Sequence, residues 1–526
     1  MSARIDRSVV LERLDMGQGG IARRELPLPV PQTYALSELL PRRPDAATLA
    51  YTLPGEMGAP LARAFERAFE LVERGYGGLG VRAPARLLTP RWHRVLNRLC
   101  HHGLARTIQL SWPLESGVPL YYFDIGSPFH DHKTDGTRPE LARYSRGFSE
   151  DYDLAISKVV GECLERGPLL YFRMRDLVRG SARSLRARGL DFVEPRELAV
   201  FSEEQIERRP EMRVDDDSVF NWTPCTSLVT SREALVPAQL VFWNYPIHWG
   251  DVPEPMLREC STHGAGGFFG VEGAILSGAL ECVQRDGFFL HWLRGVVPAR
   301  IDVTTITRPA TLELIERARD VGLEPLFLDI TSELGIPTCL CILRRHDDAH
   351  PHASMGGSCR IDGDSAIHDA LLEAASVHHV IACDPTRLRL PDDYEPFTDP
   401  TLYTHKRLAF WANPEHARHL DFFLEGAAIS AQRFGRGLVS SKDPRKNLAL
   451  VVDVLRRHGL DAWYFQAQHP ALDELGYASV RVIVPGLVPL YYEERNAPLG
   501  VARLRTAAVV ANAAPGPFTR WPHPFP

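Results

Sequence analysis

Two short segments of this 526-residue chain place acidic and basic side chains at helical spacing. Glu281 and Arg285, in LECVQRD, are four residues apart. Glu162 and Arg166 repeat this spacing in GECLER, at residues 161–166. Because residues four apart lie on one face of a helix, each segment predicts a helix with a carboxylate and a guanidinium on the same side. Such a face is suited to binding metal ions or phosphate groups.

The two segments differ in charge at one position. Glu165 follows Glu162 by three residues and shares its face, whereas the second segment has Gln284 at the equivalent place. An amide oxygen can still contact a cation, but it does not neutralise the cation's charge. The second helix is therefore expected to supply one negative charge fewer.

A glycine, an alanine and a glutamate recur three times at similar spacing. The three sets are Gly147, Ala155 and Glu162; Gly264, Ala274 and Glu281; and Gly357, Ala366 and Glu373. Seven residues fall within about 20° of two full helical turns, so each alanine lies on the face of its glutamate and leaves room beside it. We interpret the pattern as a recurring unit of strand, glycine turn and helix.

The glutamates of these helices are expected to point toward the protein interior. Small or apolar residues share their face, such as Ala155, Ile156 and Val159 in the first helix. Buried carboxylates are costly unless a cation lies close to them. Magnesium accepts carboxylate oxygens and bridges them to phosphates, so we expect the three helices to hold a nucleotide through Mg2+. The alternative is three amphipathic helices whose glutamates are solvated.

Two further features bear on a phosphate site. The glycine-rich stretch STHGAGGFFGVEG, residues 261–273, leads into the second helix, where free N–H groups favour anions. It matches neither G-x-x-x-x-G-K-[S/T] nor G-x-G-x-x-G, and a tight turn is the alternative. Arg166 is expected to bridge to Glu162 within its helix. For Arg285, a phosphate contact and a bridge to Glu281 both stay open.

Composition and charge exclude several classes of protein. A net charge of −6, with 44% apolar and 24% charged residues, is ordinary for a folded soluble protein and lacks the basic footprint that nucleic-acid binding requires. We see no signal-peptide core and no apolar run of the roughly 18 residues that span a membrane, so we expect a cytoplasmic protein. The nine cysteines form no C-x-x-C pair, and Cys339 and Cys341 are expected to be buried on one strand face.

The chain is expected to divide into an accessory region, residues 1–95, and a main domain, residues 96–526. In the main domain, apolar runs such as EPLFLDI, IPTCLCIL and YASVRVIVPG alternate with helical patterns. This predicts an α/β or α+β fold with mixed sheets. Two histidine clusters, at 129–132 and 346–354, are expected to be solvated loops, because no i, i+4 spacing brings their imidazoles together.

Four ordered motifs give the chain a resemblance to the YcaO superfamily. They are RGFSEDYDLAISKVVGECLER, STHGAGGFFGVEGAILSGALECVQRD, GGSCRIDGDSAIHDALLEA and VRVIVPGLVPLYYEERNAPLG, and the sequence then ends in PHPFP. The resemblance covers roughly residues 117–526. Within the superfamily, the chain is similar to the standalone D-protein cyclodehydratases, which make azoline rings in ribosomal peptide natural products.

The resemblance implies a YcaO-like fold that binds ATP and Mg2+ between the repeated helices. In that family a Cys, Ser or Thr side chain of the substrate peptide attacks the preceding carbonyl, ATP phosphorylates the oxyanion, and phosphate then leaves. The implied cofactor contacts are Glu162, Glu165, Glu281, Gln284, Arg285 and Glu373, of which Glu162, Glu165 and Glu281 would bind the metal.

The chain also departs from the family pattern. The departures are Gln284 for a second glutamate, Phe269 and Gly273 for an amide and an acid, and Asp369 and Ser376 for an arginine and a glutamine. Three consequences are open: the site binds fewer ions, nearby Glu272 substitutes for the missing acid, or the nucleotide binds weakly or not at all.

Alternating prolines close the sequence, at Pro522, Pro524 and Pro526. Such a segment favours a stiff extended conformation, which reaches into a cavity with little ordering cost. By resemblance to azoline-forming members, this ending is expected to lie at the active site and to act in catalysis.

The leading hypothesis is an ATP-dependent cyclodehydratase that installs thiazoline or oxazoline rings on a precursor peptide. The first ninety residues show no leader-binding segment, so a ThiF-like or other partner protein is implied, together with a homodimer or heterodimer. The alternative is a degenerate YcaO subunit that scaffolds or presents substrate to an active paralogue. A third option, formation of a thioamide or amidine, is disfavoured by the proline ending.

Overall fold

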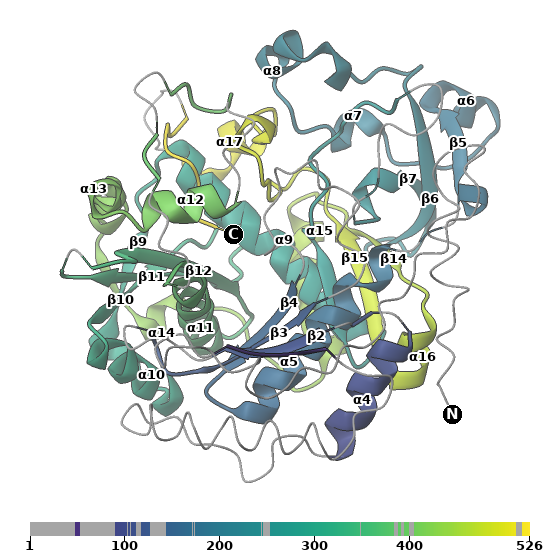
Figure 1. The fold of residues 1–526 in the computed structure, drawn as a ribbon. Coiled ribbons are helices and arrows are strands. Elements are labelled where there is room, and N and C mark those ends of the chain that lie inside the picture. The colour runs from purple at the N-terminus through teal and green to yellow at the C-terminus, as the bar shows by residue number, and fades with distance from the viewer. Residues whose placement is uncertain are drawn as a thin grey trace.

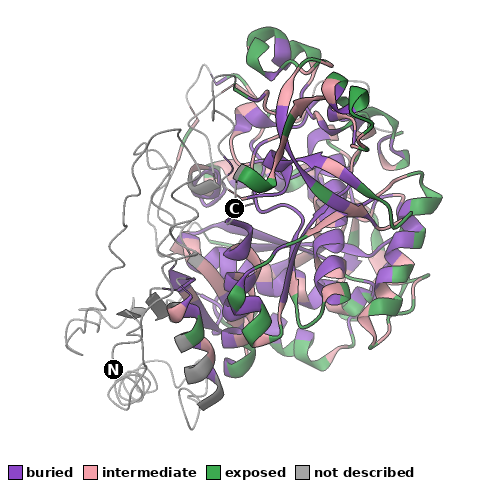
Figure 2. Ribbon diagram, turned by 90° about the vertical axis from the view of Figure 1, so that its right-hand side faces the viewer, coloured by how far each residue is buried: buried purple, intermediate pink, exposed green. Residues whose placement is uncertain are grey.

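The structure is a computed structural model. It describes residues 48–52, 90–102, 104–105, 107–111, 117–126, 144–170, 172, 174–243, 245, 253–347, 349–382, 388–390, 394–398, 404–511 and 518–525. In these parts of the chain, three β-sheets lie among helices that cover them (Figure 1). Buried residues gather where the sheets and the long helices meet, and exposed residues follow the outer helices (Figure 2).

The first sheet is antiparallel and has the order β1-β2-β3-β4. Its strands are β1 (Thr48–Thr52), β2 (Thr107–Ser111), β3 (Tyr121–Gly126) and β4 (Tyr144–Ser149). Trp92 and Leu96 of helix α4 (Pro90–His101) share a buried cluster with Ile156 and Val159 of helix α5 (Tyr152–Arg166). The predicted domain boundary at residue 95 falls within α4 and stays a prediction.

The second sheet has the order β5-β6-β14-β15-β8, with β7 also paired to β6, and all its pairings are antiparallel. Its strands are β5 (Val178–Ser181), β6 (Val219–Ser227), β7 (Glu233–Pro237), β8 (Ala265–Phe268), β14 (Trp463–Gln466) and β15 (Ala478–Ile483). All six residues of β15 are buried. The strand lies between β14 and β8, and helices α5 and α9 pack against it.

The third sheet has the order β12-β11-β10-β9-β13 and is mixed, because β13 runs parallel to β9. Its strands are β9 (Ala299–Asp302), β10 (Leu323–Asp329), β11 (Thr338–Arg345), β12 (Ala353–Cys359) and β13 (Ala428–Ser430). Cys339 and Cys341 are fully buried on β11, so their predicted place on one strand face is confirmed.

Two long helices accompany α5: α9 (Val271–Arg294) and α11 (Gly363–Ala382). The remaining α-helices of the described residues are α6 (Ala182–Ala187), α7 (Pro195–Leu198), α8 (Glu203–Arg208), α10 (Pro309–Asp320), α12 (Thr404–Trp411), α13 (Pro414–Ala417), α14 (Ala431–Phe434), α15 (Pro444–Arg457), α16 (Pro470–Leu475) and α17 (Arg503–Thr506). No helix among the described residues is both long and apolar enough to span a membrane.

Each of the three sheets ends in an edge strand that leads into one of the long helices: β4 into α5, β8 into α9 and β12 into α11. Each edge strand carries a glycine against which the helix packs directly. A Cβ atom on Gly147 would lie 2.2 Å from the carbonyl oxygen of Ala155, and one on Gly266 would lie 2.1 Å from that of Ala274. On Gly356 it would lie 2.1 Å from the backbone nitrogen of Ala374.

The packing glycines differ in part from the predicted ones. Gly147, which belongs to the predicted repeat, packs against α5. Gly266 and Gly356 pack against α9 and α11, in place of Gly264 and Gly357 of the predicted repeat. Part of the glycine-rich stretch is a strand, because Ala265–Phe268 form β8, and a phosphate contact at the start of α9 stays a prediction. The glycines of β8 allow two helices to pack closely against this one strand. In the sequence, glycines that serve this purpose look the same as glycines of a loop.

Replacement of Gly266 by alanine is expected to destabilise the fold by about 3 kcal/mol, because the new methyl group would overlap the backbone of α9. Thermal unfolding measures the effect. Gly161→Ala is the matched control: its Cβ would meet only the Tyr477 hydroxyl at 3.0 Å, and alanine is preferred within helix α5. Equal melting temperatures for the two variants would contradict the packing role of Gly266.

The histidine clusters show no metal arrangement within the described residues. The 346–354 cluster forms the turn between β11 and β12, and it is only partly solvated, because His352 is buried with its Nδ1 2.9 Å from the carbonyl oxygen of Asp347. The 129–132 cluster lies outside the described residues.

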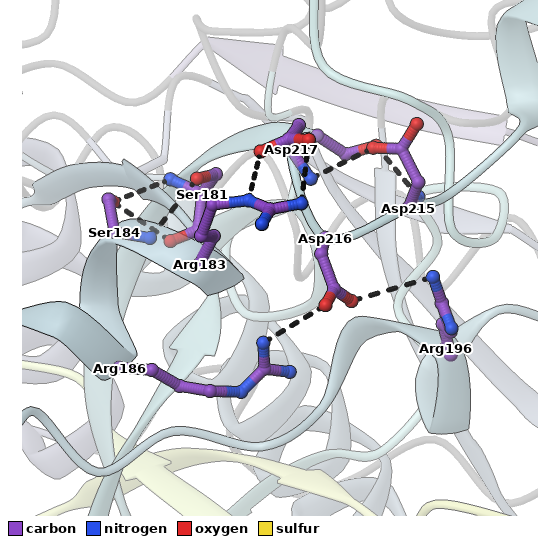
Figure 3. Close-up of polar contacts among 9 residues, drawn as sticks. Ser181, Arg183, Ser184, Arg186, Arg196, Asp215, Asp216 and Asp217 are labelled. Atoms are coloured by element: carbon purple, nitrogen blue, oxygen red, sulfur yellow. Dashed lines mark hydrogen bonds and ion pairs between the residues drawn. The ribbon is translucent and has the colours of Figure 1, made fainter.

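An acidic loop at the periphery binds the short helices α6 and α7 (Figure 3). Arg183 contacts Asp217 through two hydrogen bonds of 2.6 and 3.0 Å, and both side chains are 68% exposed. Asp216 is 3.1 Å from Arg186 and 3.5 Å from Arg196. Because water screens exposed pairs, this network contributes little to stability.

Candidate active site

The three glutamate helices meet at the centre of the molecule (Figure 1). Each packs on the edge strand that precedes it, and each also contacts the edge strand of another unit: α5 contacts β8, α9 contacts β12, and α11 contacts β4. These contacts close a ring of three strand and helix units. The acids predicted on separate helices are thereby brought toward one another.

Glu162, near the end of α5, is held by two neighbours. Its Oε2 accepts a hydrogen bond from the backbone N–H of Arg146 at 3.2 Å, and its Oε1 is paired with Arg166 one turn later. Burial raises the pKa of Glu162, and the Arg166 guanidinium opposes that rise. The predicted intrahelical bridge of Arg166 is confirmed.

Glu281, on α9, is held in the same way. Its Oε2 accepts a hydrogen bond from the backbone N–H of Gly264 at 2.9 Å, and its Oε1 lies 3.6 Å from Nη2 of Arg285. The sequence left open whether Arg285 contacts a phosphate or bridges to Glu281, and the structure shows the bridge. At 3.6 Å this contact is a loose ion pair and not a hydrogen bond, so it restrains Arg285 weakly.

Glu165 and Glu373 are different, because neither carboxylate has a hydrogen bond or ion pair within the part of the chain that the structure describes. Burial raises the pKa of Glu165 to about 8, Arg166 opposes the rise, and the carboxylates of Glu281 and Glu162 add to it. Burial also raises the pKa of Glu373, with Arg285 opposing. Glu165 therefore favours the neutral form at neutral pH until a cation approaches.

Gln284 accounts for the difference between the two helices. Its Nε2 donates a hydrogen bond of 2.9 Å to the carbonyl oxygen of Gly357, on β12. An ionised glutamate cannot make this contact, because it has no donor. The amide therefore joins α9 to the neighbouring edge strand, at the cost of one negative charge.

The sequence missed three residues that border the acids. Arg146 pairs with Asp124 of β3 at 2.9 Å, and both influence the pKa of Glu162. Lys158 lies one turn before Glu162, and Glu373 is among the acids that act on its pKa, which burial lowers. The only available signal was the spacing of Lys158 from Glu162, since strand residues such as Asp124 join the site through the tertiary fold.

These side chains fit a divalent cation with a polyphosphate. Two carboxylates lack a partner, and the Nε atoms of Arg166 and Arg285 are buried without one among the described residues. Carboxylates suit Mg2+, and guanidinium donors suit phosphate oxygens. Among the described residues, no three His, Cys, Asp or Glu side chains are grouped closely enough to hold a metal ion.

Two further departures from the family pattern, and the open question of Glu272, have a structural account. Glu272 is exposed and nine residues before Glu281, roughly 14 Å along α9, so it does not substitute for the missing carboxylate. A Cβ on Gly273 would lie 2.2 Å from the Phe268 ring, so glycine makes room for that ring. Asp369 accepts a hydrogen bond from Arg360 at 2.8 Å.

The C-terminal segment, residues 518–525, runs past α9 and α12 to the site (Figure 1). Pro522 and Pro524 are buried, and Pro526 lies outside the described residues. The ring of Phe525 lies 4.8 Å from the guanidinium carbon of Arg285. The catalytic role predicted for the prolines stays a prediction.

Comparison with protein families gives a match over residues 146–488. The family is described as YcaO cyclodehydratase, ATP-ad Mg2+-binding. An uncharacterized protein of Methanothermobacter thermautotrophicus is 26% identical over 284 residues, which are 52% of this chain and 67% of that protein. An uncharacterized protein in the tfuA 3′ region of Rhizobium leguminosarum bv. trifolii is 26% identical over 250 residues, 45% and 56% of the two chains.

Three solved structures are similar in fold. A heterocyclase in complex with substrate and cofactor has a TM-score of 0.63 at 21% identity, and the match covers 77% of this chain but only 53% of that one. The heterocyclase TruD has a TM-score of 0.55 at 17% identity, with 91% and 74% covered. A Methanopyrus kandleri protein bound with AMPPCP and Mg2+ has a TM-score of 0.51 at 17% identity, with 76% and 89% covered. The chain thus spans about half the length of the first heterocyclase.

Proposed function

This chain belongs to the YcaO family of cyclodehydratases, and on that premise we propose that it is an ATP-dependent enzyme that installs azoline rings on Cys, Ser or Thr residues of a precursor peptide. The observation that supports the proposal most directly is that carboxyl groups from three helices lie near enough to raise one another's pKa: Glu162 and Glu281 act on Glu165, and Glu162 acts on Glu373. Two of them have no partner within the described residues, and two arginines beside them keep unused donors.

The residues of the ring divide into cation-binding and phosphate-binding groups. Glu162, Glu165, Glu281 and Glu373 would hold Mg2+, and Gln284 keeps its Oε1 available to add a neutral oxygen. Arg166 and Arg285 would donate to phosphate oxygens through their Nε atoms, which have no hydrogen-bond partner among the described residues. When bound, Mg–ATP supplies the phosphoryl group that turns an amide oxygen into a leaving group.

The backbone contacts of the acids limit how far they can move. The N–H groups of Arg146 and Gly264 hold Glu162 and Glu281 beside the edge strands, so these two carboxylates are preorganised. Glu165 and Glu373 lack such contacts and would close on the cation when it binds. We infer that the peptide is delivered by a partner protein, as the sequence resemblance implies.

Binding of ATP in the presence of Mg2+, measured by calorimetry, tests the proposal. The unmodified protein is expected to bind Mg–ATP with a Kd of about 1 μM to 1 mM, and to lose binding when Mg2+ is chelated. Glu162→Gln is expected to weaken binding at least about tenfold, since it removes a charge from the cation site.

Glu313→Gln is the matched control for this experiment. Glu313 also pairs with an arginine four residues later, Arg317, but lies exposed on α10. It is expected to leave Mg–ATP binding unchanged. A protein that binds no ATP, with or without Mg2+, would contradict the enzyme and support the second candidate, a degenerate subunit that presents substrate to an active paralogue. The amide of Gln284, which leaves the site with one negative charge fewer, favours that second candidate.

A further inference from the structure

The C-terminal segment is fixed by hydrogen bonds to its backbone. Trp292 of α9 donates to the carbonyl oxygen of Trp521 at 3.3 Å, and Trp411 of α12 donates to that of Pro522 at 3.0 Å. Arg407, which is fully buried, donates to the carbonyl oxygen of Phe525 at 3.1 Å. These contacts use main-chain atoms, so they set the path of the segment whatever side chains it carries.

The side chain of Phe525 enters a slot between α9 and β12. Its ring centroid is 4.3 Å from that of Phe288, in an edge arrangement, and the ring is 1% exposed. A Cβ atom on Gly357 would lie 3.0 Å from the Phe525 ring, so glycine at this point of β12 opens the slot. The Phe525 ring is therefore held rigidly.

Arg285 has few other restraints. The guanidinium carbon lies 4.8 Å from the centre of the Phe525 ring, whereas the ion pair with Glu281 is loose at 3.6 Å. The Arg285 side chain is 15% exposed, and its Nε has no hydrogen-bond partner among the described residues. The ring is thus the most firmly placed neighbour of this cation.

We propose that Phe525 is a positioning residue, whose ring supports the guanidinium of Arg285 so that its N–H groups are presented to the phosphates of a bound nucleotide. This inference rests on the proposed function. A guanidinium that lies over an aromatic face keeps its donors in its own plane, where the ring does not compete for them. The C-terminal segment thereby couples its own docking to the affinity of the site.

Deletion of the segment is a poor test, because it would also strip Arg407 and Trp411 of their acceptors. Phe525→Leu is sharper, since it keeps most of the apolar volume but removes the aromatic face. Loss of a cation–π contact of about 0.5–2 kcal/mol corresponds to about 2–30-fold weaker binding. We expect Mg–ATP affinity to fall about fivefold to tenfold.

Phe518→Leu is the matched control. Phe518 belongs to the same segment and lies over two arginines, Arg294 at 5.5 Å and Arg505 at 5.7 Å, which are not among the cations bordering the acids. It is expected to leave Mg–ATP affinity unchanged. In turnover assays, Phe525→Leu is expected to raise KM for ATP more than it lowers kcat, whereas misfolding would lower the active fraction and leave KM unchanged.

A double-mutant cycle separates failure of this inference from failure of the proposed function. Phe525→Leu and Arg285→Met, alone and together, are compared by thermal unfolding without nucleotide. Non-additive shifts in Tm support the contact even if the unmodified protein binds no ATP. Additive shifts, or equal Mg–ATP affinities of Phe525→Leu and the unmodified protein, would overturn the positioning role.

Discussion

Replacement of Glu165 by glutamine is expected to lower Mg2+-dependent turnover at least about 100-fold while making the ligand-free protein more stable. Glu165 is crowded by the carboxylates of Glu162 and Glu281 and has no partner of its own among the described residues. Its charge is therefore a liability to the fold that a bound cation would relieve. A residue kept for structure alone would lose stability on the same change.

The stability gain is expected to depend on pH. The pKa of Glu165 is about 8 in the folded protein, compared with an ordinary value of 4.5. Between these values the folded state holds a proton that the unfolded state has released, so stability falls as pH rises. The penalty is absent below pH 4.5 and complete above pH 8. The advantage of Glu165→Gln should thus grow across this window and level off above it.

Thermal unfolding at pH 5, 7 and 8.5, without Mg2+, measures this effect. Glu313→Gln serves as the control, and its Tm difference from the unmodified protein should change little with pH, because Glu313 is exposed. In the same range, the affinity of the unmodified protein for Mg–ATP should increase as the pH rises, because the cation must displace a proton from Glu165. A Tm of Glu165→Gln below that of the unmodified protein at pH 8.5 would refute the account.

The acids of the site were predictable because their signal is local. Glu162, Glu281 and Glu373 each follow an alanine by seven residues on a helix, and a helix places such residues on one face. Their partners were less accessible. Asp124 reaches the site from β3, and Phe525 reaches it from the opposite end of the chain. Only the closure of the ring of helices and strands brings these residues together.

Glycine was the main source of error in the fold. The composition of residues 261–273 favours a loop, yet four of them form an edge strand between α5 and α9. Gly266 is required because α9 lies against it, and Gly267 because a Cβ there would lie 2.9 Å from the Cβ of Glu165. Close approach of helices is a tertiary property, and the sequence does not distinguish it from the flexibility of a turn.

The prolines of the C-terminal segment likewise drew attention from its aromatic residue. Alternating prolines predicted an extended segment that reaches the site, and Pro522 and Pro524 are buried within it. Hydrogen bonds to its backbone fix the path of the segment, whereas contact with Arg285 is made by Phe525. A phenylalanine between prolines has no distinctive pattern, so its role appears only when its neighbours on α9 and β12 are known.

A large loss of stability is expected from replacing Asp286, the residue after Arg285, by alanine. Asp286 is fully buried and accepts hydrogen bonds from Arg503 at 3.0 and 2.6 Å, and from the backbone N–H of Val488 at 3.0 Å. Removing one member of a buried pair leaves the other desolvated without compensation. We expect the free energy of unfolding to fall by about 3 kcal/mol, at the lower end of the range for breaking a buried ion pair. The loss is limited because Arg503 retains its ion pair with Glu333 at 2.6 Å.

Asp217→Ala gives a control with nearly the same hydrogen-bond geometry at the surface. Asp217 also accepts two hydrogen bonds from one arginine, at 2.6 and 3.0 Å, but the pair is exposed (Figure 3). Its loss should leave the urea midpoint nearly unchanged, because water solvates both partners. If Asp286→Ala shifted the midpoint no further than Asp217→Ala, burial would not govern the strength of these pairs. If Asp286→Leu with Arg503→Met recovered stability, the cost would lie in the stranded charge.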